Sequence, residues 1–529
     1  VDGAHHDNSL SSRIDLEVLS AAVQGLSVEM IRVEADVSNG LPMFHMVGYL
    51  SSEVKEASER VRTAIRNSGM KLPAKKIIVN LAPATVRKRG ASFDLPIALA
   101  VLAAMNYVPE EALKGVAVIG EVSLEGKIRG VSGVLPIVME AKNQGCTACI
   151  LPEENEIEGR LVSGIKILPA DNLEKLCEYL NGDEKEIHRK KQGRSSAQRN
   201  IFENKKEDFS DIYGQNAVKR AAEIAVAGGH NLLMAGPPGS GKSMIARRIA
   251  TILPELSLEE SLEITRIYSV LGMIDKEQPL ITRRPFRSVH HTITKTALVG
   301  GGMTPRPGEI SMAHGGVLFL DELAEFPRNV LEVLRQPLEE HQIHIARNYG
   351  NFTFPAEFML VAAMNPCPCG NYPDMQKCSC TPSQIQKYLG KISQPFLDRM
   401  DLCIETPKVE YRELDIERIG KKEEESSEVI RSRVVEARKL QKKRYEGTQI
   451  RTNSMLGPGE IRTYIPLGSA ERKLMEKAFE RMGLTARTYH KILRVARTIA
   501  DLDYSEKVTE KHLKEAIAYR SLDKKYWGR

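Results

Sequence analysis

Long apolar runs and a strong excess of either charge are both absent from this sequence of 529 residues. The longest apolar run, LPIALAVLAAM at 95–105, is too short to span a bilayer and lacks the flanks of a signal peptide. We therefore expect a cytoplasmic protein without a membrane partner. The formal net charge of +6 permits a polyanionic partner, but it is too small for this length to predict one.

Cysteine is also scarce, with eight residues in the whole chain, which does not suggest a disulfide framework. Four of the eight crowd into PCPCGNYPDMQKCSC, and they are Cys367, Cys369, Cys378 and Cys380. Two CxC pairs across a short polar stretch offer four thiolates for tetrahedral Zn²⁺, although the spacing is not that of the common CxxC knuckle. We favour structural zinc. Free thiols remain an alternative, and so does a disulfide, which a reducing compartment disfavours.

The composition divides the chain into parts. Residues 181–206 are polar and charged with few apolar positions, so we interpret them as a linker. We expect an N-terminal extension of uncertain origin at 1–20 and a first domain at 21–180. An α/β core at 207–406 and a charged helical lid at 407–529 follow the linker.

The α/β prediction depends on three short apolar runs, NLLMAG, GVLFLDE and FMLVAAMN. They alternate with amphipathic helical stretches, a pattern typical of a parallel sheet flanked by helices. The sequence therefore predicts a nucleotide-binding α/β fold with a helical lid.

The first run leads directly into a phosphate-binding motif. The motif GPPGSGKS matches G-x-x-x-x-G-K-[ST], with a strand before it and the amphipathic stretch MIARRIATIL after it. Backbone NH groups of such a loop surround phosphate oxygens, Lys242 reaches the β- and γ-phosphates, and Ser243 binds Mg²⁺. The predicted ATP-binding residues are Gly236, Pro237, Pro238, Gly239, Ser240, Gly241, Lys242 and Ser243.

The other two runs end in polar residues suited to hydrolysis. Asp321 would hold Mg²⁺ and Glu322 would act as general base, while Asn365 would orient the attacking water. An acidic pair can also be a solvated strand edge, and a strand-end Asn is often a turn former. Their order after the phosphate-binding motif favours the catalytic interpretation.

Two arginines, Arg399 in LDRMD and Arg487 in GLTARTYHK, would each be a surface ion pair if taken alone. The order of all these motifs resembles an AAA+ ATPase. More narrowly, RPFRSVHHT, VGGGMTPRPGEISMAHGGVLFLDELAEF and MNPCPCG are similar to the magnesium-chelatase-like YifB/ComM family, over about residues 21–519. The resemblance implies that Arg399 is an arginine finger in a homo-hexamer and that Arg487 is the lid's sensor arginine. It also implies that Gly214, in DFSDIYGQ, belongs to a segment that packs against adenine.

Two β-prone runs in HQIHIARNYGNFTFPAEF flank a plausible hairpin turn. The resemblance implies that this insert projects into the pore of a ring, where Arg347 would grip a phosphate and Tyr349 would stack on a base. A hairpin that only contacts neighbouring subunits is the alternative. Magnesium chelatases share the insert without translocating DNA, so the hairpin does not discriminate between a DNA motor and a chelatase. The cysteine loop favours the ComM-like branch.

The first domain resembles the proteolytic domain of Lon in RKRGASFDLPIALAVLAAM and GKIRGVSGVLPIVMEAKNQG. Ser92 lies where the nucleophile would be, but Leu135 stands at the position of the activating lysine. We therefore expect a Lon-like α+β domain without proteolytic activity. Its basic cluster of Arg87, Lys88 and Arg89 suits either phosphate contact or a solvated turn.

Together these features predict a hexameric AAA+ ATPase that uses ATP and Mg²⁺ to translocate on single-stranded or branched DNA. The resemblance implies helicase or branch-migration activity in homologous recombination during natural transformation. The alternative is a magnesium-chelatase-type motor that acts on a protein or porphyrin-insertion partner. An ATP-dependent protease and an ATP-switched scaffold are further alternatives.

Overall fold

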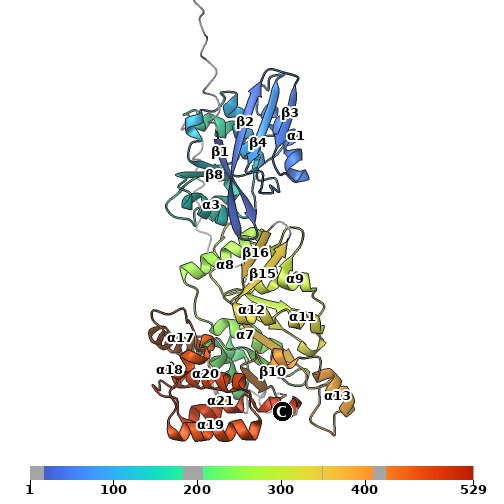
Figure 1. The fold of residues 1–529 in the computed structure, drawn as a ribbon, viewed down its shortest axis with the longest axis vertical. Helices are drawn as coiled ribbons and strands as arrows, with labels where there is room; N and C mark the ends of the chain where they lie inside the picture. The colour runs from blue at the N-terminus through green and yellow to red at the C-terminus, as the bar shows by residue number, and fades with distance from the viewer. Residues whose placement is uncertain (1–16, 183–206, 348–349, 409–423, 528–529) are drawn as a thin grey trace, which may run out of the picture. The chain divides into compact units, whose positions relative to one another are not determined.

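The computed structural model describes residues 17–182, 207–347, 350–408 and 424–527. They form two compact units (Figure 1). The first contains the described residues up to 182 together with 261–281 and 304–306, and the second contains the others. Most of the predicted linker and N-terminal extension, and Tyr349, lie outside the described residues. No helix among the described residues is both long enough and apolar enough to cross a membrane.

The first unit is built on a seven-stranded mixed sheet in the order β3-β4-β2-β1-β5-β8-β9. The strands β1 and β2 form an antiparallel pair, whereas β5, β8 and β9 run parallel. The strand bounds are β1 Glu17–Gln24, β2 Ser27–Ser38, β3 Met43–Val47, β4 Lys76–Ala82, β5 Val116–Val118, β8 Ala148–Pro152 and β9 Lys166–Ala170. Its main helices are α1 Ser52–Asn67, α2 Asp94–Ala104, α3 Val134–Asn143, α5 Leu173–Leu180 and most of α8 Leu258–Leu271.

The apolar run noted in the sequence forms most of α2, which is buried on all sides against this sheet. A helix that is apolar all round belongs in a core, so the run is used for packing. At the N-terminus of α2, the carboxylate of Asp94 accepts two hydrogen bonds of 2.9 Å from Arg60. Burial raises the pKa of Asp94, and the Arg60 guanidinium opposes that rise.

Two residues of the Lon comparison lie in this unit. Leu135 is fully buried, and its amide donates to Glu158 Oε1 at 2.9 Å, so the position expected for a catalytic lysine is apolar and enclosed. Of the basic cluster, Lys88 is also fully buried and donates to the carbonyl oxygen of Pro83. Phosphate contact by Lys88 is therefore wrong for this structure, because its ammonium group points away from solvent.

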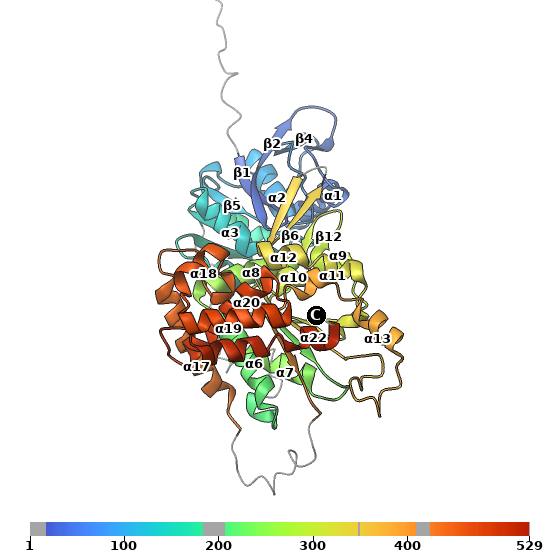
Figure 2. The same cartoon turned by 60° about the horizontal axis from the view of Figure 1, so that its bottom comes forward.

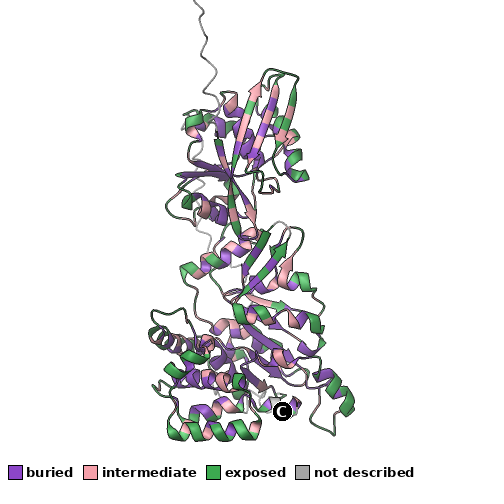
Figure 3. Cartoon of the chain, in the orientation of Figure 1, coloured by how far each residue is buried: buried purple, intermediate pink, exposed green. Residues whose placement is uncertain are grey.

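The second unit contains a five-stranded parallel sheet in the order β11-β14-β17-β10-β18. Its central strands are buried on both faces, as parallel sheets covered by helices require (Figure 3). The strands are β11 Phe286–Val289, β14 Val317–Leu320, β17 Met359–Met364, β10 Leu232–Ala235 and β18 Leu402–Glu405. An antiparallel hairpin, β15 Gln342–Arg347 and β16 Gly350–Pro355, is separate from this sheet.

The helices of the second unit form two groups, one beside the sheet and one that forms the lid. Those beside the sheet include α6 Asn216–Gly228, α7 Lys242–Ile249 and α13 Pro382–Leu389. The lid helices that pack on one another (Figure 2) are α17 Ser427–Arg444, α18 Pro458–Tyr464, α19 Ser469–Met482, α20 Ala486–Leu502 and α21 Glu510–Ala518, while α22 Ser521–Trp527 contacts β18. The predicted α/β core with a helical lid, after a Lon-like α+β domain, is confirmed.

A buried ionic cluster anchors the lid to the sheet. The carboxylate of Asp401 lies 2.9 Å from the Lys491 ammonium of α20 and accepts a hydrogen bond of 2.9 Å from the Asn231 amide. Burial by itself raises the pKa of Asp401, yet Lys491 and the nearby His230 hold that pKa at about 2. The pair therefore stays ionised inside the protein.

We expect Asp401→Asn to lower the free energy of unfolding by about 3–5 kcal/mol, because it leaves the Lys491 ammonium buried without a counter-charge. Urea denaturation followed by the fluorescence of the single tryptophan, Trp527 in this unit, measures the change. The matched control is Glu436→Gln, which breaks the exposed pair with Lys439 and should cost less than about 1 kcal/mol. Equal effects of the two substitutions would contradict the anchoring role.

Candidate active site

The predicted catalytic motifs meet at one edge of the parallel sheet. The phosphate-binding loop follows β10, Asp321 follows β14, and Asn365 follows β17, which lies between the other two strands. Residues of these three strands pair in parallel register, so their carboxyl ends point the same way. Ligands of open α/β sheets bind at this edge. The fold therefore brings together groups that are far apart in the sequence, 78 positions for Ser243 and Asp321 and 123 positions for Lys242 and Asn365.

The phosphate-binding loop has a backbone that needs its glycines. Gly239 and Gly241 have φ of +75° and +80°, a region that side chains other than glycine rarely adopt. A Cβ on Gly236 would lie 2.2 Å from the carbonyl oxygen of Thr406, so no side chain fits there. The loop leads into the N-terminus of α7, where free amides and the helix dipole favour a phosphate group.

Lys242 is held at the centre of the site. It is only 9% exposed, and its Nζ donates to Gly236 O at 2.8 Å, Pro237 O at 2.9 Å, Ser240 Oγ at 3.3 Å and Asn365 Oδ1 at 3.3 Å. Burial lowers the pKa of Lys242 to about 8, while the charge of Asp321 acts in the opposite direction. Because burial removes water from the Lys242 ammonium, an anionic group such as a phosphate is favoured beside it. The contact between Lys242 and Asn365 also brings two of the predicted catalytic residues together.

A hydroxyl and a carboxylate form the candidate magnesium site. Ser243 Oγ donates to Asp321 Oδ2 at 2.7 Å, and Asp321 Oδ1 accepts from the Glu322 amide at 2.9 Å. Mg²⁺ prefers oxygen ligands such as these. It needs only one or two of them from the protein, because water molecules and the phosphates of the nucleotide complete its coordination. Glu322 is half-exposed and has a φ of +53°. Its carboxylate is therefore accessible to a water molecule at the sheet edge.

Sequence reasoning missed a residue beside Glu322, the predicted general base. His291, just after β11, places its Nδ1 3.1 Å from Glu322 Oε2. The His290 ring lies 4.0 Å from that of His291, and Phe326 meets His291 edge-on at 6.4 Å. These contacts hold the imidazole beside the Glu322 carboxylate, where a small rotation would let its Nδ1 hydrogen-bond to that carboxylate. The signal in the sequence was the position of His291 just after the FRSV strand. Because β11 pairs in parallel with β14, residues that follow these two strands lie at the same edge of the sheet.

We expect His291→Ala to lower kcat for ATP about tenfold while leaving the KM for ATP nearly unchanged, because misplacing a general base affects the chemical step. Steady-state hydrolysis at saturating ATP, with thermal unfolding as the check on folding, measures both parameters. His291→Asn, which keeps a polar group near Glu322, should recover part of the loss. An unchanged kcat in the alanine variant would refute the positioning role.

The predicted adenine segment is tied to the phosphate-binding loop. The Gly214 amide donates to Glu424 Oε1 at 3.2 Å. Its neighbour Gln215 has a φ of +51° and donates from Nε2 to Ser240 O at 2.9 Å and to Pro407 O at 3.2 Å. The segment thus lies beside the loop, and contact between Gly214 and adenine stays a prediction.

The predicted arginine finger, Arg399, and the predicted sensor arginine, Arg487, lie near each other. Arg399 is 9% exposed and bonds to the Glu339 carboxylate and to the carbonyls of Pro395 and Arg335, none of which belongs to the phosphate-binding loop. Burial lowers the pKa of Arg399, and the charge of Arg487 adds to the effect. Arg487 itself is exposed in the first turn of α20. Arg399 is thus paired with Glu339 in this chain while Arg487 is open to solvent, and both roles stay predictions.

The predicted hairpin is present. Arg347 and Gly350 pair across the end of β15 and β16, and Ile343, Ile345, Phe352 and Phe354 bury one face of it. Arg347 is exposed beside the turn. Tyr349 lies outside the described residues, so its stacking role is not assessed by this structure.

The four clustered cysteines converge. Their sulfur atoms all lie within 4.8 Å of one another, with separations of 3.3, 3.8 and 3.6 Å among Cys367, Cys369 and Cys378. A tetrahedral zinc site with bonds of about 2.3 Å requires separations of about 3.8 Å between sulfurs. The Tyr372 amide also donates to Cys367 Sγ at 3.4 Å, as outer-shell groups of thiolate sites do. The donor set and its spacing therefore fit Zn²⁺.

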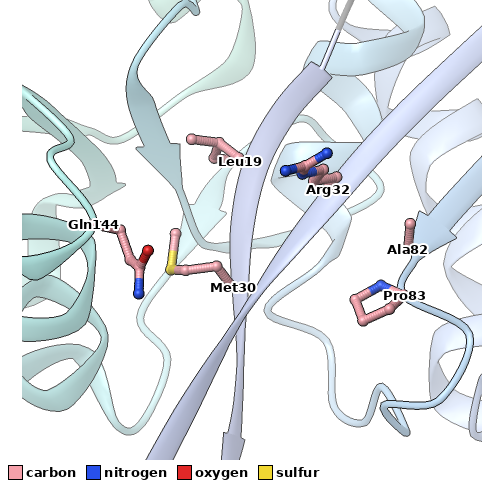
Figure 4. Close-up of a pocket in the computed structure, with 6 residues that line it drawn as sticks. All are labelled: Leu19, Met30, Arg32, Ala82, Pro83 and Gln144. Atoms are coloured by element: carbon pink, nitrogen blue, oxygen red, sulfur yellow. The ribbon is translucent and has the colours of Figure 1, made fainter.

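A cavity of about 480 Å³ lies in the first unit and not at this sheet edge. It is lined by residues of β1, β2, β4 and the end of α3 (Figure 4), namely Leu19, Met30, Arg32, Ala82, Pro83 and Gln144. These side chains include no carboxylate, thiol or imidazole, so they offer no group for acid–base or nucleophilic chemistry.

The sheet-edge site and the helical lid define a P-loop ATPase of the AAA+ class. Family models agree with this assignment: "Magnesium chelatase, subunit ChlI" matches residues 208–414, "Subunit ChlI of Mg-chelatase" matches 33–155, and "Magnesium chelatase, subunit ChlI C-terminal" matches 424–520. Hydrolysis of ATP with Mg²⁺ follows from the class and from the residues at the sheet edge.

Two relatives match nearly the whole chain. The protein YifB of Escherichia coli is 44% identical over 507 residues, which are 96% of this chain and 97% of YifB. The competence protein ComM of Haemophilus influenzae is 42% identical over 512 residues, 96% of this chain and 97% of ComM. Lon protease 2 of Bacillus subtilis is 29% identical over 130 residues, 24% of this chain. The chain belongs to the magnesium-chelatase-like AAA+ family that includes YifB and ComM.

Proposed function

We propose that this ATPase assembles as a homo-hexamer, translocates on single-stranded or branched DNA, and drives branch migration in homologous recombination during natural transformation. The observation that carries the proposal is the near full-length similarity to the competence protein ComM. The hairpin of β15 and β16, with Arg347 exposed beside its turn, supports it as a DNA-gripping element.

The chemistry follows from the sheet edge. Lys242 and the loop amides neutralise the β- and γ-phosphates of ATP, while Ser243 and Asp321 would hold Mg²⁺, which supplies further charge neutralisation. Glu322 accepts a proton from the attacking water, and Asn365 orients that water. In the proposed ring, Arg399 of a neighbouring subunit stabilises the charge that develops on the γ-phosphate.

The first test compares ATP hydrolysis without DNA and with single-stranded, duplex and four-way-junction DNA, using Lys242→Ala as the blank. Stimulation by single-stranded or junction DNA that disappears in the blank supports translocation on DNA. Strong hydrolysis that ignores every DNA would refute DNA as the substrate while leaving the ATPase in place.

A second candidate is a magnesium-chelatase-type motor that acts on a protein or porphyrin-insertion partner, because all three family models carry that description. Stimulation of hydrolysis by porphyrin-binding subunits, and not by DNA, would favour it.

We expect Arg347→Ala to weaken binding to single-stranded DNA about three- to tenfold and to reduce the slope of log K against log salt by about 0.7, because one phosphate contact is lost. Basal hydrolysis of ATP should be unchanged. Fluorescence anisotropy across a salt series measures both effects. Arg472→Ala, which removes an exposed arginine from lid helix α19, is the matched control. An Arg347→Ala protein that binds DNA like this control would contradict a DNA-contacting hairpin.

We also propose that Cys367, Cys369, Cys378 and Cys380 hold one structural Zn²⁺. Metal analysis of protein purified without chelators should find one zinc per chain, and the double variant Cys378→Ser, Cys380→Ser should lose it. Cys146→Ala, at a cysteine in the core of the first unit, is the control and should keep the metal. Zinc-free wild-type protein would refute the site.

A further inference from the structure

The loop that carries the clustered cysteines, residues 366–380, begins directly beside the catalytic sheet edge. Asn365 directly follows β17 and contacts Lys242 at 3.3 Å, and Cys367 comes two residues later with no exposed surface. The short segment between them is thus held by the ATP site at one end and by the sulfur cluster at the other. Only Pro366 separates Asn365 from Cys367, so a movement of the sulfur cluster is passed directly to Asn365.

The same loop also packs on the phosphate-binding loop. Gly370 has a φ of +79°, and a Cβ at this position would lie 2.3 Å from Pro238 Cδ and 2.9 Å from its Cγ. The backbone of Gly370 therefore lies in direct contact with the proline ring. Pro238 stands in the middle of the phosphate-binding loop, so this contact supports the loop from outside.

A further contact fixes the other side of the cysteine loop. The Tyr372 ring lies 6.1 Å from the Tyr526 ring on α22, and Tyr526 donates to Glu405 Oε1 at 2.8 Å. Glu405 ends β18, and the next residue, Thr406, is the one that leaves no room for a side chain on Gly236. The cysteine loop is held between the phosphate-binding loop on one side and α22 on the other.

Within the loop, a few hydrogen bonds and the sulfur cluster hold the chain in shape, for example those from the Asn371 side chain to the Lys377 carbonyl oxygen and from the Gln376 amide to Asp374. Helix and strand are absent between β17 and α13 in this described stretch, and Met375 is 65% exposed. Its cysteines other than Cys367 are half-buried, so the loop lacks an apolar core of its own. Four cysteine sulfurs this close can bind one thiophilic cation as thiolates, with loss of their protons. A bound metal ion would therefore join the start of the loop, at Cys367 and Cys369, to its end, at Cys378 and Cys380.

We propose that the four-cysteine site is a metal-dependent brace for the ATP site: a bound thiophilic divalent cation, Zn²⁺ in the first place, holds Gly370 against Pro238 and Asn365 beside Lys242. This inference rests on the zinc site proposed above. Loss of the metal frees the cysteine loop, which then no longer supports the phosphate-binding loop. Nucleotide binding must then order the phosphate-binding loop as well, and this cost in free energy lowers the affinity for nucleotide.

The test measures zinc content and the dissociation constant of the fluorescent nucleotide mant-ATP at saturating Mg²⁺. Wild-type protein, protein stripped of zinc and returned to Mg²⁺ buffer, and the Cys378→Ser, Cys380→Ser variant are compared. We expect the Kd to rise about tenfold in both zinc-free samples. Adding one equivalent of zinc should restore the affinity of the stripped wild-type protein, and the serine variant should not respond.

A second pair of variants tests the contact without touching the metal ligands. Gly370→Ala places a methyl group against Pro238 and should weaken mant-ATP binding about tenfold while zinc content is retained. Gly447→Ala is matched to it, because Gly447 has a φ of +78° but nothing within 4 Å of the added Cβ. This control shares the backbone strain without the clash, so it should bind mant-ATP like wild type.

The outcomes separate the two proposals. Wild-type protein that contains no zinc overturns the metal site and the brace together. Protein that contains zinc but keeps its Kd for mant-ATP after stripping, and in Gly370→Ala, overturns the brace and leaves the metal site standing.

Discussion

Glu322→Gln protein should bind ATP as tightly as wild type and hydrolyse it about 100- to 10,000-fold more slowly, the usual effect of removing a general base. Glutamine keeps the size and hydrogen-bonding capacity of the side chain but cannot accept the proton of the attacking water. Neither the Asp321–Ser243 contact nor the cradle around Lys242 involves the Glu322 carboxylate, so nucleotide binding should persist.

Single-turnover hydrolysis and mant-ATP titration on the same preparation separate these two effects. Lys242→Ala is the contrasting variant, because it removes the phosphate-binding ammonium and should lose ATP binding as well. A Glu322→Gln protein that retained more than about a tenth of the wild-type rate would exclude Glu322 as the base.

Arg399→Ala should reduce kcat about 1,000-fold or more, the range found for arginine fingers. In this structure Arg399 bonds to Glu339 and to backbone carbonyls, so a loss of activity alone could arise from disturbed packing of its segment. A mixing experiment distinguishes the two causes, because an arginine finger acts on the nucleotide of the next subunit.

Lys242→Ala and Arg399→Ala chains are each expected to be inactive alone. In a one-to-one mixture, about a quarter of the contacts in a ring place an intact ATP site beside an intact Arg399, so up to about a quarter of wild-type hydrolysis should return. Mixing Lys242→Ala with Glu322→Gln is the matched control, since both defects lie in the same subunit's site and no activity should return. A mixture with Arg399→Ala that also stays inactive would refute action between subunits.

The sequence alone was enough to predict that the phosphate-binding motif, Asp321 and Asn365 meet at one edge of the sheet. The phosphate-binding motif, Asp321 and Asn365 each follow an apolar run, and parallel strands bring such ends together. Sequence reasoning missed His291 because β11 is short and only its last residue, Val289, is buried, so no apolar run marks it as a strand. Its contact with Glu322 also depends on strand order, which hydrophobic periodicity does not encode.

The cysteine loop was predicted in part. Paired CxC spacings indicate a thiolate site, but they carry no information about which surface the loop covers. The approach of Gly370 to Pro238 joins residues that are far apart in the chain, and local patterns are silent on such contacts. Burial of Lys88 was unexpected for a similar reason, since its acceptor, the Pro83 carbonyl, is placed by a bend of the chain.

The ionic cluster at Asp401 has a mechanical consequence. Asp401 stands two residues after Arg399, and it is bonded both to Asn231 at the start of β10 and to Lys491 of α20. These contacts connect the lid helix, the sheet and the arginine segment, so a tilt of the lid would also displace the Arg399 guanidinium, the group proposed to act on the next subunit. In the proposed ring, this connection would couple the nucleotide state of one subunit to the ATP site of the next. The subunits would then hydrolyse ATP one after another around the ring.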